Sequence, residues 1–377
     1  MSTRIATRAG VWAAMVVCVG MLASGTATAE TAHTAETEAT FRIDRSSVQE
    51  ALDAMTSSGA QGVQARVTHG NDHLEARSGT AELDGRRPVP HDGRFRIGSV
   101  TKMFVSTVVL QLVGEGKVNL DAPVSRYLPG ALPDGQAITV RMLLQHTSGL
   151  YNYTGALPLD FPAFEGIRYR QWALPELVAI STARPLDFAP GTNWSYSNTN
   201  YIVAGMLVEK ITGQPYGRAV EQRILRPLEL RATSVPGNRV EVPGPHAHGY
   251  ARNGDRIVDI TEINPSVAAS AGEIISTAGD LDRFLDALLD GRLLAPKELD
   301  EMTRMPPFAV GYGLGIERRT LGCGVTVWGH GGGIIGYSSL LLSTRDTSKR
   351  LELLMTSAPD GGDVQGTQQL LDEVFCP

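Results

Sequence analysis

A serine and a lysine stand three residues apart in an otherwise mostly apolar stretch, FRIGSVTKMF (residues 95–104). Five of the 34 basic residues are lysines, so arginine is the usual cation of this chain. Arginine keeps its proton at any accessible pH, whereas a desolvated lysine can lose it. Residues i and i+3 of a helix share one face, so Lys102 could take the proton of Ser99 and make its hydroxyl a nucleophile. The alternative is an N-cap serine followed by a surface lysine.

A second polar group occurs in WSYSNTNY (residues 194–201), directly before a predicted helix from Thr199 to Thr212. The phenol of Tyr196 can relay a proton between a nucleophile and a leaving group. The amide of Asn198 can hold both a lysine and a substrate carbonyl. The alternative interpretation is a polar turn that caps the helix.

The stretch VWGHGGGIIGYSS (residues 327–339) permits three interpretations. A dinucleotide-binding G-x-G-x-x-G needs a helix next, but YSSLLLS is typical of a strand. The oxyanion loop of lipases needs a G-x-S-x-G elbow downstream, and none follows. We therefore predict a strand edge at which a cationic His330 stands beside Gly331, Gly332 and Gly333, whose lack of side chains lets a substrate backbone approach.

The remaining histidines do not indicate a metal site. His246 and His248 have metal-ligand spacing, but no third ligand is plausibly spaced nearby. We predict no metal and no cofactor.

The N-terminus indicates export. Arg4 and Arg8 precede an apolar run over residues 11–22, and Ala27-Thr28-Ala29 resembles a cleavage site. We predict a signal peptide (1–29), a flexible leader (30–40), and a secreted, extracellular monomer without a membrane anchor. The net charge of −6 and the absence of a basic run argue against nucleic acid as a partner.

Cleavage leaves two cysteines, Cys323 and Cys376. In an oxidising compartment such a pair is usually joined. We predict a disulfide that closes the C-terminal segment onto a core strand; the alternative is two buried thiols.

Periodicity places strands near both ends of the chain and helices in the middle. Strands are expected within residues 61–79 and at 312–317, 324–328, 338–343 and 351–356. The predicted fold is α/β (α+β), with an antiparallel sheet flanked by helices. Residues 41–120 and 270–377 form an α/β lobe, and residues 121–269 form an inserted, mostly helical lobe.

The order S-x-x-K, Y-x-N, H-x-G resembles the penicillin-recognising serine hydrolases, in particular secreted DD-carboxypeptidases and class C β-lactamases. Segments such as HTSGLYNYT and SAGEIISTAGDLDRFLDALLDG also look like that family. The resemblance implies a β-lactamase/DD-peptidase fold and the following roles: nucleophile Ser99, proton partner Lys102, general acid/base Tyr196, orienting amide Asn198, His330 in place of the lysine of K-T-G, and an oxyanion hole from the N–H groups of Ser99 and Gly333.

Three positions depart from the carboxypeptidase pattern. Gly331 and Gly333 stand where those enzymes have hydroxyls, and Glu317 stands where they have an arginine that holds the terminal carboxylate. A glutamate there repels a carboxylate, and Arg319, two residues along the same strand face, could compensate.

The sequence therefore predicts a secreted serine-type D-Ala-D-Ala carboxypeptidase that acts on peptidoglycan stem peptides through an acyl-enzyme and is inhibited by β-lactams. The first alternative is an esterase or a D-amino-acid amidase or aminopeptidase of the same fold, with a small substrate that contains a D-amino acid. A class C-like β-lactamase and a non-catalytic penicillin- or peptide-binding protein are the further alternatives.

Overall fold

The computed structural model describes residues 43–308, 311–356 and 365–376. Residues Arg42–Pro377 belong to one compact unit that includes both predicted lobes. The predicted signal peptide and leader lie outside the described residues and stay predictions. No helix in the described ranges has the length and apolarity that a membrane crossing requires.

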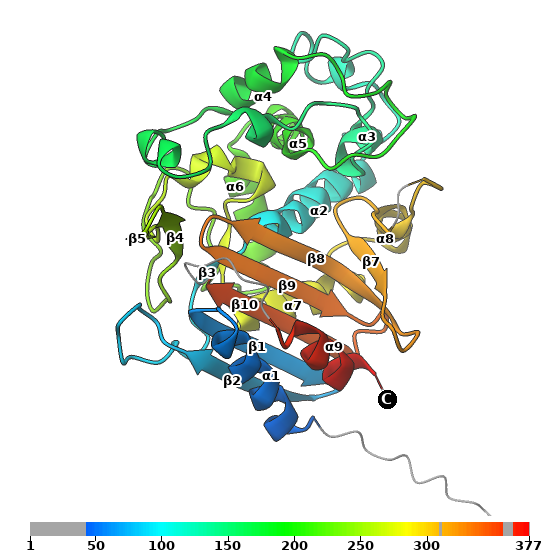
Figure 1. Cartoon of the computed structure of the whole chain (residues 1–377). Coiled ribbons are helices and arrows are strands. Elements are labelled where there is room, and N and C mark those ends of the chain that lie inside the picture. Colours follow the sequence, from blue (N-terminus) through cyan, green and yellow to red (C-terminus); the bar gives the residue numbers. More distant parts are fainter. Residues whose placement is uncertain (1–42, 309–310, 357–364, 377) are drawn as a thin grey trace, which may run out of the picture. The chain divides into compact units, whose positions relative to one another are not determined.

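The centre of the fold is a six-stranded antiparallel sheet in the order β2-β1-β10-β9-β8-β7. The two ends of the chain supply its strands, as predicted (Figure 1). The strand bounds are β1 (Gly62–His69), β2 (Asp72–Gly79), β7 (Glu317–Thr320), β8 (Thr326–Ile334), β9 (Tyr337–Ser343) and β10 (Lys349–Thr356).

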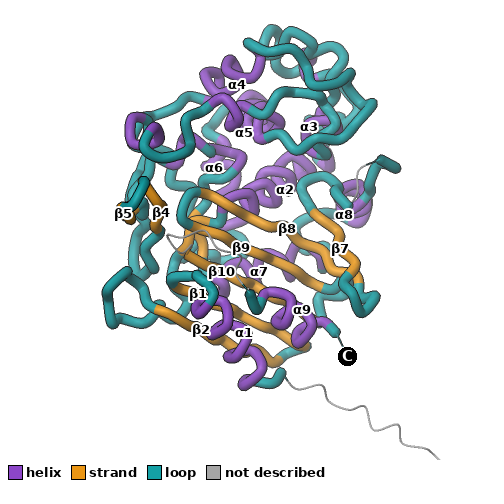
Figure 2. The backbone as a smooth tube through the Cα atoms, in the orientation of Figure 1, coloured by secondary structure: helices purple, strands orange, loops and turns teal. Residues whose placement is uncertain are grey.

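Helices cover both faces of this sheet, as Figures 1 and 2 show. Helices α1 (Arg45–Ser57) and α9 (Thr367–Phe375) lie on one face, where their leucines and valines pack against alternate residues of β1 and β10. Helix α7 (Ala278–Leu289) lies on the other face, against β1, β9 and β10. The central strands β1 and β10 are thus buried on both sides, whereas the outer strands β2 and β7 are largely exposed.

Helix α2 (Thr101–Gly114) is buried around nearly its whole circumference, as its continuous apolarity predicts. It packs against α5, α6 and α8. The remaining elements are α3 (Val140–Leu144), α4 (Leu174–Thr182), α5 (Asn198–Thr212), α6 (Tyr216–Val220) with a π-helical turn Glu221–Leu225, α8 (Pro296–Thr303), the hairpin β4 (Tyr250–Asn253) and β5 (Arg256–Asp259), and the short pair β3 (Phe95–Arg96) and β6 (Ile275–Ser276).

Two predicted strands were placed wrongly. The run 312–317 is not a strand: Gly315 has a positive φ of 79°, and a Cβ there would lie 2.2 Å from Ser106 Oγ, so the chain turns against α2 before β7 begins at Glu317. The strand expected at 324–328 instead runs on as β8 to Ile334, because pairing with β9 continues through all three glycines of the His-Gly-Gly-Gly run.

The predicted disulfide joins Cys323 to Cys376. Cys323 lies in the turn between β7 and β8, not on a core strand, so the bridge fastens the end of α9 to this turn.

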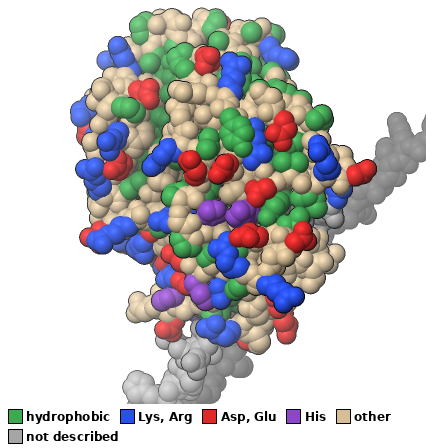
Figure 3. Space-filling view, turned by 90° about the vertical axis from the view of Figure 1, so that its left-hand side faces the viewer, with side chains coloured by type: hydrophobic (Ala, Val, Ile, Leu, Met, Phe, Trp, Pro, Cys, Tyr) green, Lys and Arg blue, Asp and Glu red, His purple; other side chains and the backbone are tan. Residues whose placement is uncertain are grey.

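On the face shown in Figure 3, basic and acidic side chains are interspersed.

Candidate active site

Ser99 lies on a single 3₁₀ turn (Gly98–Val100) between β3 and α2. Gly98 has a positive φ of 51°, and a Cβ there would lie 2.6 Å from the backbone N of Gly333. Only glycine allows this close approach. Ser99 is thereby held beside the edge of β8, so that the backbone N–H groups of Ser99 and Gly333 belong to adjacent segments.

Lys102 is fully buried one turn after Ser99. Its Nζ lies 2.9 Å from Ser99 Oγ, 2.8 Å from Asn198 Oδ1 and 2.7 Å from the carbonyl oxygen of Ala271. Burial lowers the pKa of the lysine well below its usual value, and the charge of Glu317 opposes this only in part. The amide and carbonyl oxygens cannot donate, so a neutral amine gives both its hydrogens to them and turns its lone pair toward Ser99.

Tyr196 and Asn198 come from the segment that enters α5. The hydroxyl of Tyr196 lies 2.8 Å from Ser99 Oγ, and burial raises the pKa of this tyrosine above its usual value, so the phenol stays protonated. The backbone N–H of Asn198 donates to Asn152 Oδ1 over 3.1 Å. This bond fixes the backbone from which the side-chain amide of Asn198 reaches Lys102. Ser99, Lys102, Tyr196 and Asn198 therefore meet at one point, although almost a hundred residues separate the two pairs.

His330 is buried on β8, and its charge differs from the prediction. Burial lowers the pKa of His330 to about 4, with Glu317 opposing the shift. The imidazole is therefore neutral at pH 7, and the predicted cation is wrong. Its Nε2 lies 2.9 Å from the hydroxyl of Tyr312, and its Nδ1 lies within hydrogen-bond distance of the carbonyl oxygen of Gly331.

Sequence reasoning missed Tyr312 and His146. Both are buried, and the Tyr312 hydroxyl lies 3.2 Å from Nε2 of His146. Nδ1 of His146 accepts from the backbone N–H of Ser197 and the side chain of Asn200, so Nε2 carries the proton and donates to Tyr312. Tyr312 in turn donates to His330.

These bonds form one chain that joins the Tyr196 segment to β8. His146 also packs on the ring of Tyr196, with centroids 4.3 Å apart, and has a positive φ of 62°. Such a conformation is uncommon outside glycine and occurs often at functional sites. The sequence signal was weak: His146 stands in HTSGLYNYT, but nothing in that segment indicates a contact with residue 312.

The three glycines of β8 have different surroundings. A Cβ on Gly332 would lie 2.1 Å from the carbonyl oxygen of Ile97, so this glycine is required by packing. A Cβ on Gly333 would meet nothing within 4 Å, and one on Gly331 would lie 3.4 Å from the guanidinium of Arg319. Gly333 is therefore exposed, and because the pairing of β8 with β7 ends at Gly329, this edge of β8 is open at Gly333.

Glu317 and Arg319 form an ion pair on β7, on the same strand face, as their spacing predicts. Arg319 Nε lies 3.0 Å from Glu317 Oε2. The other carboxylate oxygen, Oε1, lies 3.6 Å from Nδ1 of His330. The pair is thus next to the site.

This arrangement suits acyl transfer: a hydroxyl is contacted by a buried amine and a protonated phenol, beside an open strand edge. Among the described residues, no three His, Cys, Asp or Glu side chains gather in a way that could hold a metal ion. The fold and the site are those of a serine hydrolase with the β-lactamase fold.

Residues 48–374 match the family model described as Beta-lactamase, and the chain belongs to this family. A D-stereospecific amidohydrolase from Streptomyces sp. has a similar structure, with 44% identity and a TM-score of 0.82 over 88% of this chain and 99% of the other. A D-amino acid amidase from Ochrobactrum anthropi SV3 aligns with 30% identity and a TM-score of 0.77, over 87% and 97% of the two chains. Esterase EstB of Burkholderia gladioli is 32% identical, over 77% of this chain and 80% of its own.

Proposed function

We propose that this protein is a serine hydrolase that cleaves amides and esters of D-amino acids through an acyl-enzyme on Ser99. The observation that carries the proposal is that Ser99 Oγ is contacted by both Lys102 Nζ and the hydroxyl of Tyr196, at 2.9 and 2.8 Å. The names of the amidohydrolase, the amidase and the esterase support this substrate class. This is the first alternative from the sequence, placed ahead of the D-Ala-D-Ala carboxypeptidase.

In acylation, neutral Lys102 takes the hydroxyl proton as Ser99 Oγ attacks the substrate carbonyl. The oxyanion is stabilised by the backbone N–H groups of Ser99 and Gly333. The protonated phenol of Tyr196 gives its hydrogen to the leaving nitrogen or oxygen, which leaves a phenolate beside protonated Lys102. In deacylation, water enters on the vacated side and gives a proton to the Tyr196 phenolate as its oxygen attacks the ester carbonyl. Lys102 returns its proton to Ser99 Oγ as the ester bond breaks, and the acid is released.

The surroundings of Ser99 disfavour a leaving group that carries a free carboxylate, as a terminal amino acid does. A carboxypeptidase must bind a free carboxylate, and such recognition is worth about 1.5–3 kcal/mol per charged hydrogen bond. Here Gly331 and Gly333 offer no hydroxyl, and Glu317 places a negative charge beside the site. Amides and esters do not need that recognition.

The test compares hydrolysis of D-phenylalanine amide, L-phenylalanine amide, a D-Ala-D-Ala peptide and the C-terminal amide of that peptide. We expect the D-amide to be cleaved at least tenfold faster than the L-amide, and amidation of the peptide to leave its cleavage unchanged or raise it. If amidation of the peptide abolishes its cleavage, the result would instead support the D-Ala-D-Ala carboxypeptidase function.

Ser99→Ala should abolish turnover. The control is Ser234→Ala, which removes a buried hydroxyl that has no hydrogen-bond partner within the described ranges. Full turnover by Ser99→Ala would refute the proposal.

A further inference from the structure

The two carboxylate oxygens of Glu317 have different neighbours, Arg319 for Oε2 and His330 for Oε1. Arg319 binds Oε2 and is 43% exposed, whereas the Glu317 side chain is 21% exposed. Oε1 lies nearer the interior, 3.6 Å from Nδ1 of His330. Among the described residues, Arg319 is the one side-chain hydrogen-bond donor to this carboxylate. The negative end of the ion pair therefore faces inward.

The position of Tyr196 indicates which part of a substrate would meet this charge. Its hydroxyl contacts Ser99 Oγ and would protonate the leaving group, so the leaving group must extend toward Tyr196. The Tyr196 ring contacts the ring of Tyr312, whose hydroxyl bonds to His330, which in turn adjoins Glu317. The charge of Glu317 is felt at both Lys102 and Tyr196. Glu317 thus lies on the leaving-group side.

We infer that Glu317 selects substrates by the charge of the leaving group, favouring cationic amines and disfavouring anionic ones. The inference rests on the proposed function and narrows its substrate class: D-aminoacyl amides whose leaving amine carries a positive charge, followed by neutral amides.

Arg319 positions Glu317. Its guanidinium holds Oε2 and lies over Gly331, where a Cβ would come within 3.4 Å of it. Because it is the more exposed partner, water screens its charge more strongly than that of Glu317. The carboxylate therefore dominates the potential within the site.

The experiment compares three substrates that share a D-phenylalanyl group: the aminoethyl amide (cationic), the propyl amide (neutral) and the glycine conjugate (anionic). One charge interaction at a partly exposed site changes an equilibrium by about tenfold. We therefore expect kcat/KM to fall in that order, with about a hundredfold range from cationic to anionic.

Glu317→Gln keeps the size of the side chain and should compress this range to about threefold or less when each kcat/KM is taken relative to that of the propyl amide. Glu317→Arg should reverse the order. The matched control is Arg318→Gln, which alters the charge of the opposite face of β7 and should leave the range intact. An unchanged range in Glu317→Gln, or a wild-type preference for the glycine conjugate, would overturn the inference.

A second measurement separates this inference from the proposed function. N-propylacetamide, N-aminoethylacetamide and N-acetylglycine are tested as inhibitors of Ser99 acylation by a fluorescent penicillin. If none of the amide substrates is cleaved, the proposed function fails. The charge preference then stands or falls on whether the cationic inhibitor binds most tightly and loses that advantage in Glu317→Gln.

Discussion

The hydroxyl of Tyr312 lies 2.9 Å from Nε2 of His330 and 3.2 Å from Nε2 of His146, and thereby joins the two walls of the site. One wall is β8, and the other is the loop that carries Tyr196. All three side chains are buried, so no water replaces a bond that is lost.

Tyr312→Phe should therefore destabilise the protein by about 1–3 kcal/mol, because both imidazoles lose a buried partner. It should also lower kcat, because Tyr196 is no longer held in a fixed position relative to β8. Urea unfolding and steady-state kinetics measure the two effects. The matched control is Tyr216→Phe: that hydroxyl is buried and has no partner in the described part of the chain, so its loss should cost little. Equal stability of the two variants would contradict this role.

Lys102→Arg should lower kcat by three orders of magnitude or more. Arginine stays protonated and cannot accept the proton of Ser99. In the wild type, burial lowers the pKa of Lys102, and protonation below that pKa removes the base. The rate of Ser99 acylation should accordingly fall on the acid side of the pH profile. Single-turnover kinetics across pH provide the check; substantial activity in Lys102→Arg would show that another group is the base.

Penicillin should acylate Ser99 and leave slowly. A neutral base next to the hydroxyl permits attack on a strained lactam carbonyl. Intact-mass measurement should show one adduct, and peptide mapping should place it on residue 99. Ser99→Ala should show none. Rapid turnover without accumulation would point to a β-lactamase, and an adduct on the alanine variant would exclude Ser99 as its site.

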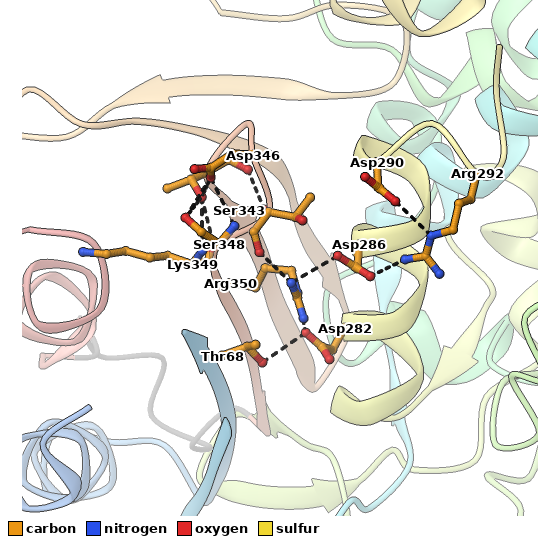
Figure 4. A network of polar contacts seen from close by, with 12 residues as sticks. Thr68, Asp282, Asp286, Asp290, Arg292, Ser343, Asp346, Ser348, Lys349 and Arg350 are labelled. Carbon is orange, nitrogen blue, oxygen red and sulfur yellow. Dashed lines mark hydrogen bonds and ion pairs between the residues drawn. The ribbon is translucent and has the colours of Figure 1, made fainter. Parts of the chain in front are cut away.

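Glu352→Gln should stabilise the protein at alkaline pH. Glu352 lies fully buried on β10, neither of its carboxylate oxygens has a partner among the described residues, and burial and Asp282 raise its pKa well above the usual value. It faces Arg66, Arg350, Asp282 and Asp286; Figure 4 shows Arg350 with both aspartates.

The sign follows from proton binding. Between about pH 4.5 and its raised pKa, the folded protein holds this proton more tightly than the unfolded chain does. The free energy of unfolding therefore falls as pH rises, by up to about 1.4 kcal/mol per pH unit from this group. Urea unfolding should show a smaller fall in Glu352→Gln, and an unchanged one in Glu75→Gln, an exposed glutamate paired with Arg66. If the free energy of unfolding still falls steeply with rising pH in Glu352→Gln, a group other than Glu352 causes the fall.

Local patterns predicted much of this molecule. Apolar periodicity located α5 and the strands β1, β2, β9 and β10 to within a few residues. It failed around Gly315, where contact with Ser106 decides the conformation, and at β8, where pairing with β9 carries a strand through three glycines. Glycine has no strand preference of its own, so a tertiary contact had to decide both places.

The sequence by itself determined the types and the spacing of the residues that could carry out the chemistry. These are Ser99 and Lys102 on adjacent turns, Tyr196 and Asn198 before a helix, and a glycine-rich strand after His330. Tertiary structure alone decided their protonation and their neighbours. Burial keeps His330 neutral, Tyr312 and His146 join the two walls, and Oε1 of Glu317 faces His330. A pKa depends on solvent exclusion and on charges from distant segments, and no local pattern contains either.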